Sequence, residues 1–288
     1  TRTVRGMRRD LDWDCRYVDA PDGCFDMEQL AEQLQDGPTS LISVMRVQNE
    51  TGWIFPIPEI AQLRDELAPG VPLHCDATQA FCKMPVNPRE WGVQLLTAGA
   101  HKIGGPRGIG ILYVQRGLPM HTTAFGGNQE RGLRSGTEPV FLVVGMAEAV
   151  RITAAHMETD MEYAASLRER AIEGLKREIP DAVVHAPEGG SPYILSVSVP
   201  GLPNAVSVKY LSGRRVCVSR AAACEENHTT VAPGTWRPKH PLALQAAGIP
   251  LREGKETLRA SFFHRNTPED VDRFVAVLAQ CAREMRES

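Results

Sequence analysis

The sequence lacks the features that mark membrane, secreted and nucleic-acid-binding proteins. No apolar run approaches the roughly 18 residues that span a bilayer, and the longest, residues 140–144, is far too short. The first residues carry no apolar leader segment. No basic block stands out, and the net charge is -3. We therefore expect neither a membrane nor a nucleic acid as a partner.

Cysteine pairs at metal-ligand spacing are also absent. The chain has seven cysteines, an odd number, and none forms a Cys-x-x-Cys motif. This pattern argues against a disulfide framework and against a zinc site. Free thiols fit a reducing compartment, so we expect a cytoplasmic protein with no metal, whose cysteines serve as core residues or as reagents.

What the sequence does contain is an ordinary globular composition, with 288 residues of which 42% are hydrophobic and 23% charged. In the first half, short apolar runs alternate with helical apolar spacing. Helices are predicted at residues 27–34, 58–67 and between 76 and 94, and strands at 41–47, 71–76, 94–98 and 108–114. Strands that alternate with helices indicate an α/β fold with a mostly parallel sheet.

The second half has a different pattern, typical of a smaller α+β domain. A long amphipathic helix from residue 157 ends before Pro180, and residues 193–199 alternate as a strand. We predict a short helix capped by Asn204, a strand around Cys217, and a last helix that begins at Thr267-Pro268. The length suggests two domains, which we place at residues 1–150 and 151–288.

Two candidate chemical groups follow predicted strands, one strand-helix unit apart. Asp76 ends one strand, and Lys102 follows the next with a glycine-rich turn behind it. Ligands of open α/β sheets bind at the carboxyl ends of strands. A lysine that forms a Schiff base and an acid that pairs with a ring nitrogen are the groups that pyridoxal 5'-phosphate needs. Taken singly, each residue is more often a turn, cap or surface residue.

Longer motifs resemble those of one enzyme family. Residues 74–79, His-Cys-Asp-Ala-Thr-Gln, resemble the His-Val-Asp-Ala-x-Gln segment of the cysteine desulfurase and selenocysteine lyase branch of the class V aminotransferase-fold enzymes. Residues 100–110 are similar to its Schiff-base lysine segment, and residues 126–138 to its most diagnostic stretch. Residues 47–52, 221–224 and 258–261 continue the likeness, in the family's order, over nearly the whole chain.

The resemblance implies the α/β fold of pyridoxal-phosphate transferases of fold type I, and a role for each matching residue. Lys102 would carry the cofactor and move protons. Asp76 would pair with the pyridine nitrogen, and Gln79 would hydrogen-bond the phenolic oxygen. His101 would help to hold the phosphate and is also a catalytic candidate. Thr137 would reach the phosphate of the other subunit, which implies a homodimer.

The remaining residues would act on the substrate. Asn49 and Arg259 would bind the carboxylate of L-cysteine, and Cys224 would accept its sulfur as a persulfide while alanine leaves. Such an enzyme supplies sulfur for iron–sulfur clusters, thio-cofactors or modified tRNA, so a sulfur-acceptor scaffold protein is an expected partner. The resemblance does not separate this activity from a selenocysteine lyase, another carbon–sulfur lyase or a class V aminotransferase.

Two departures from the family pattern affect cofactor binding. Gly99 stands where the family has a serine that contacts the phosphate. No residue stretch matches the family's Gly-Ala-Thr phosphate loop or its ring-stacking histidine, and the sequence begins with Thr rather than Met. We therefore expect a fragment of a longer enzyme. A site completed by a second chain and a truncated, non-catalytic paralogue are the alternatives.

Overall fold

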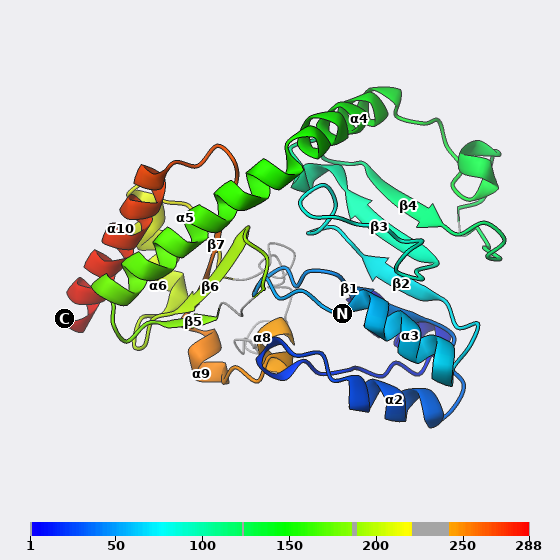
Figure 1. The fold of residues 1–288 in the computed structure, drawn as a ribbon, viewed down its shortest axis with the longest axis horizontal. Coiled ribbons are helices and arrows are strands. Elements are labelled where there is room, and N and C mark those ends of the chain that lie inside the picture. The colour runs from blue at the N-terminus through cyan, green and yellow to red at the C-terminus, as the bar shows by residue number, and fades with distance from the viewer. Residues whose placement is uncertain (1, 123, 186–188, 221–241, 288) are drawn as a thin grey trace.

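A computed structural model describes residues 2–122, 124–185, 189–220 and 242–287. The chain forms two separate β-sheets (Figure 1). The first sheet has helices α2 (Met27–Gln35) and α3 (Ile57–Leu67) beside it. A long helix, α5 (Met157–Glu178), runs from the region of α4 (Val140–Ala155), near the first sheet, to the second sheet. The earliest segments are α1 (Arg2–Leu11) and the short helical turn η1 (Pro21–Gly23).

The first sheet has four strands in sequence order. They are β1 (Ile42–Met45), β2 (Leu73–Asp76), β3 (Leu95–Gly99) and β4 (Gly110–Val114). The first three pair in parallel, and β4 runs antiparallel to β3. Leu73 and Cys75 are fully buried on one face of β2, as the alternation of a strand requires. The predicted mostly parallel sheet is confirmed, and its antiparallel last strand makes it a mixed sheet.

The second sheet is antiparallel and carries its helices on one side (Figure 1). Its strands are β5 (Val183–His185), β6 (Ile194–Ser198) and β7 (Thr257–Ser261), in that order. Helices α5 and α10 (Pro268–Arg286) pack together beside it. Thr267 caps α10 through a capping box with Asp270, as Thr-Pro at a helix start predicts. The remaining helices are α6 (Asn204–Gly213), α8 (Leu242–Ala246) and α9 (Leu251–Gly254).

Three local predictions were wrong. Residues 216–218 form no strand, and only an isolated bridge joins Ser219 to Arg259. Asn204 does not cap α6; its amide donates to the carbonyls of Gly254 and Thr257, which ties α6 to β7 instead. The predicted helix between β2 and β3 is a series of turns. The domain division near residue 150 stays a prediction.

Among the described residues, no helix is by itself long and apolar enough to cross a membrane. Helices α4 and α5 meet that length and composition only when joined across a bend of 72°.

Candidate functional site

Asp76 lies where the parallel strands of the first sheet reach their carboxyl ends. The register places it beside Met45 of β1 and Thr97 of β3. Its Oδ1 atom accepts a hydrogen bond of 2.9 Å from the backbone N–H of Thr78. The N–H of Ala77 donates to the carbonyl of Thr97 at 2.9 Å. The half-buried carboxylate is thus fixed at the edge where α/β enzymes bind ligands.

A row of polar side chains crosses three strands next to Asp76. Ser43 Oγ lies 2.8 Å from His74 Nδ1, and His74 Nε2 lies 3.1 Å from Thr97 Oγ1. Burial lowers the pKa of His74, and the nearby Asp76 opposes that shift. Because His74 and Asp76 are two residues apart on β2, both side chains face the same side of the sheet. The row therefore holds the three strands in register beneath the carboxylate.

Lys102 follows β3 on a single helical turn, η2 (Ala100–Lys102). The N–H groups of Ile103 and Gly105 both donate to the carbonyl of Ala100, at 3.0 and 2.9 Å. Gly104 has a φ of +80°, and a Cβ on Gly105 would lie 3.0 Å from the carbonyl oxygen of Ala100. The glycines after the lysine are therefore required for this tight turn, which presents the half-buried Lys102 at the strand end.

His101 takes the space that a side chain at Gly99 would need. A Cβ on Gly99 would come within 3.1 Å of two ring atoms of His101. A side chain at position 99 would therefore require the His101 ring to shift. Desolvation lowers the pKa of His101, and the positive charges of Lys102, Arg107 and Lys83 lower it further.

Lys83 is a site residue that the sequence analysis did not identify. The turn at residues 77–84 is helical enough to bring Lys83 over Gln79, four residues earlier, because Phe81 and Met84 donate to the carbonyls of Ala77 and Ala80. Lys83 Nζ donates a long hydrogen bond of 3.4 Å to Gln79 Oε1. It also lies 5.3 Å from the centre of the Tyr193 ring.

Positive charges gather around the predicted Schiff-base lysine. Burial, followed by the charges of Lys102 and Arg259, lowers the pKa of Lys83 to about 8. We call Lys83, Lys102, Arg107 and Arg259, which lie around the neutral ring of His101, the cation cluster. Lys102 and Arg259 oppose the protonation of Lys83, so the cluster favours an anionic ligand that would neutralise it.

Arg259 and Asn49 come together across 210 positions of sequence. Arg259 lies on β7, and its Nη1 donates to the backbone carbonyl of Asn49 at 2.9 Å. The backbone of Arg259 also exchanges two hydrogen bonds with Ser219, at 3.0 and 2.7 Å. The second sheet thereby delivers an arginine to the loop that follows β1.

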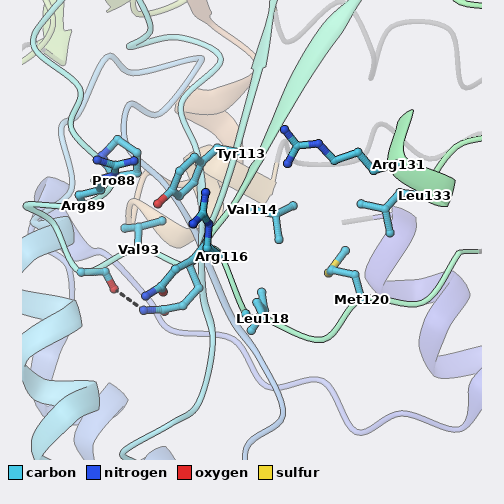
Figure 2. A pocket seen from close by; sticks show the side chains of 14 residues that line it. Pro88, Arg89, Val93, Tyr113, Val114, Arg116, Leu118, Met120, Arg131 and Leu133 are labelled. Carbon is cyan, nitrogen blue, oxygen red and sulfur yellow. Dashed lines mark hydrogen bonds between the residues drawn. The ribbon is translucent and has the colours of Figure 1, made fainter. Parts of the chain in front are cut away.

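Two cavities differ sharply in size and in lining. A groove of about 860 Å³ lies at the end of β4 and is lined by Tyr113, Arg116 and Arg131 among others (Figure 2). It contains none of the predicted site residues. The second cavity, of about 20 Å³, lies at Lys102 and Lys83 and is also lined by Tyr193. The two amines of the smaller cavity, Lys83 and Lys102, lie on the turns that follow β2 and β3.

The other side of the small cavity holds an ion pair. Asp160 of α5 and His264 both line it, and His264 Nδ1 lies 3.3 Å from Asp160 Oδ2. Burial raises the pKa of Tyr193 to about 12, and Asp160 adds to that shift. The Tyr193 hydroxyl therefore stays protonated at neutral pH.

The structure does not place two of the predicted site residues, Thr137 and Cys224, beside Asp76 and Lys102. Thr137 is exposed, on the segment between η3 (Gln129–Gly132) and α4. Cys224, the predicted sulfur acceptor, lies outside the described residues.

Spacing is the one signal by which the sequence could have revealed Lys83. A lysine four residues after Gln79, just past a strand end, is consistent with a shared helical turn. Tyr193, Asp160 and His264 are distant in sequence and carry no such signal.

Known proteins resemble the chain in sequence and in structure. The family model of class-V aminotransferases matches residues 7–274. A cysteine desulfurase from Nostoc sp. is 33% identical over 92% of this chain and 63% of the relative. The cysteine desulfurase IscS of Clostridium botulinum is 31% identical over 92% of this chain and 65% of its own. The chain thus spans less than two thirds of the length of these relatives.

A solved structure described as a NifS-like protein superimposes with a TM-score of 0.85 at 28% identity, over 97% of this chain and 72% of that one. The superposition includes both sheets, and the family match extends from residue 7 into α10. The chain belongs to the class-V aminotransferase family.

Proposed function

We propose that this chain forms a large part of a pyridoxal-phosphate-dependent cysteine desulfurase, which moves sulfur from L-cysteine to Cys224 and releases L-alanine. One observation carries the proposal. Asp76 and the Lys102 turn follow adjacent parallel strands, and the cation cluster surrounds the lysine. The similarity to curated cysteine desulfurases supports the same activity.

The chemistry of the residues at this edge fits pyridoxal phosphate. Asp76 supplies a carboxylate for the ring nitrogen, Lys102 an amine for the aldehyde, and His101 a donor near the phosphate. Gln79 accepts from Lys83 through Oε1, which leaves its amide N–H₂ to donate to the phenolic oxygen. When bound, the cofactor supplies an electron sink for the bonds to the substrate's α-carbon.

The protein's own groups would do the remaining work. Arg259 would bind the substrate carboxylate as a fork, at the Asn49 loop that it already contacts. The Lys102 amine, displaced by the substrate's amine, would take the α-proton and later return a proton to the product. Taking the α-proton requires an unprotonated amine, and the ammonium that this step leaves can then return a proton to the product.

Sulfur transfer would use Cys224 as the nucleophile. Its thiolate would attack the sulfur of the substrate, so that a new S–S bond forms as the substrate's C–S bond breaks. The electron pair of the C–S bond returns to the organic fragment, which is protonated and leaves as alanine. No outside oxidant or reductant is needed.

Assembly and location are part of the same proposal. Thr137 would reach the cofactor phosphate of a second copy in a homodimer. The exposed apolar side chains of α4, Val140, Phe141, Val143 and Val144, fit such a contact. We further propose a cytoplasmic location and a sulfur-acceptor scaffold protein as partner.

The test follows both products of the reaction. Incubation with L-cysteine and pyridoxal phosphate is expected to release alanine and to leave one extra sulfur on Cys224, which alkylation and peptide mass spectrometry detect. Cys224→Ser should abolish the persulfide at that position. Alanine release without any persulfide on Cys224, or persulfide delivery that survives Cys224→Ser, would contradict the assignment.

A further inference from the structure

We propose that Lys83 is a positioning residue for Lys102, whose positive charge across the small cavity keeps the Lys102 amine in its neutral, nucleophilic form. The inference rests on the proposed role of Lys102 as the cofactor-binding amine. It adds a second lysine to the site, one that touches neither cofactor nor substrate in the proposed function.

The geometry holds Lys83 close to Lys102. Both line the cavity of about 20 Å³, which has room for about one water molecule. Gln79 Oε1, at 3.4 Å, and the face of Tyr193, at 5.3 Å, fix the ammonium from two sides. Neither neighbour carries a negative charge at neutral pH, because burial keeps the Tyr193 hydroxyl protonated.

The positive charges that act on Lys83 come from two elements, Lys102 on η2 and Arg259 on β7. His101, next to Lys102, has a lowered pKa and adds no positive charge at neutral pH. Cys82 precedes it and lines the same cavity, and burial raises the pKa of that thiol. The one carboxylate at the cavity, Asp160 of α5, is paired with His264 at 3.3 Å. Among the described residues, none forms an ion pair with Lys83.

The amines of Lys83 and Lys102, which line the same small cavity, oppose each other's protonation. Like charges in a site of low dielectric disfavour the doubly protonated state, and the effect is mutual. The pKa of Lys83 already falls to about 8, and Lys102 is the largest contribution after burial. The same interaction must favour the neutral form of Lys102. A neighbouring cation is an established way to activate a lysine nucleophile.

The experiment measures the reactivity of single lysines in the chain without cofactor. A trace of acetic anhydride labels only unprotonated amines, and peptide mass spectrometry reports the labelled fraction at each lysine. Lys83→Met should lower the labelling of Lys102 near neutral pH roughly threefold or more, since each pKa unit is about tenfold. Lys83→Arg keeps the charge and should keep the labelling. The exposed Lys176→Met is the matched control.

The reverse measurement uses a second variant, so the proposal does not depend on the folding of one protein. Lys102→Met should lower the labelling of Lys83 by a similar factor, because coupling between two sites is reciprocal. Unchanged labelling of Lys102 in Lys83→Met, or an equal loss in Lys83→Arg, would overturn the proposal. Alanine release from cysteine is scored separately. Coupling without alanine release would leave this inference standing and remove the proposed function.

Discussion

The groove at the end of β4 and the small cavity at Lys102 differ in size and in lining, and we propose that the smaller one is the site. The groove is about forty times larger by volume, about 860 against about 20 Å³. Three arginines, Arg89, Arg116 and Arg131, line it, but no lysine and no carboxylate. The small cavity has an aspartate–histidine pair and two lysines, which lie on the turns after β2 and β3. The proposed site therefore rests on strand topology and charge rather than on open volume.

The largest expected effect is that of a substitution in the small cavity, at Lys102. Lys102→Ala should lower alanine formation roughly 10³-fold or more, because both the covalent attachment and the proton transfer are lost. Steady-state assays with L-cysteine measure it, and circular dichroism checks the fold. Residual activity above a few per cent would mean that another amine carries the reaction.

Arg259→Lys should give the next largest effect. Lysine keeps the charge but cannot form a fork with the substrate carboxylate, and it loses the contact with the Asn49 carbonyl. We expect kcat/KM to fall about 10- to 100-fold, mainly because KM rises. This fall corresponds to a loss of about 1.4–2.8 kcal/mol of transition-state stabilisation. Arg131→Lys in the groove is the matched control, and an equal loss there would erase the contrast between the cavities.

Below pH 8, Lys83→Met should raise the free energy of unfolding by on the order of 1–3 kcal/mol. The reason is that it removes a buried positive charge that lies close to other positive charges. The folded pKa of Lys83, about 8, lies below the unfolded value of about 10.4. Between these values the unfolded chain binds more protons, so the native protein gains stability as pH rises and the cost of the charge disappears.

Denaturant unfolding of Lys83→Met and the native protein at several pH values measures this. The advantage of the variant should shrink as pH rises from 8 to above 10. Lys176→Met should show no such trend, because its side chain is exposed. A constant difference across that range would contradict the lowered pKa of Lys83.

The smallest effect is expected in the groove. Arg116 is exposed and lines the groove, and it has no part in the proposed reaction. Arg116→Ala should leave kcat/KM within about twofold and the free energy of unfolding within about 0.5 kcal/mol. A large loss of turnover in assays with L-cysteine would show that the groove takes part in the reaction.

The sequence was informative where a local pattern decides the structure. The alternating apolar residues before Asp76 and the glycines after Lys102 predicted two strand ends, and Thr267-Pro268 predicted the start of α10. The strand at 108–114 was expected too, but its direction was not. Only eleven positions separate Gly99 from Gly110, and a parallel crossover needs a dozen or more residues, so β4 returns antiparallel.

The parts that failed depend on contacts between distant segments. Residues 216–218 have the apolar alternation of a strand, but only Ser219 reaches a partner, Arg259. Asn204 is a good capping residue by type, yet two carbonyls near β7 draw its amide away. Lys83 looks like an ordinary surface lysine until Tyr193, 110 positions later, closes over it. Such contacts depend on tertiary packing between segments that are far apart in the sequence, so no local sequence pattern predicts them.

Borohydride reduction of the chain with bound pyridoxal phosphate tests the central claim most directly. The reduced, cofactor-bearing peptide should contain Lys102, and Asp76→Ala should weaken the binding of the cofactor without moving the attachment point. A cofactor fixed to Lys83, to a lysine elsewhere, or to none at all would contradict the account.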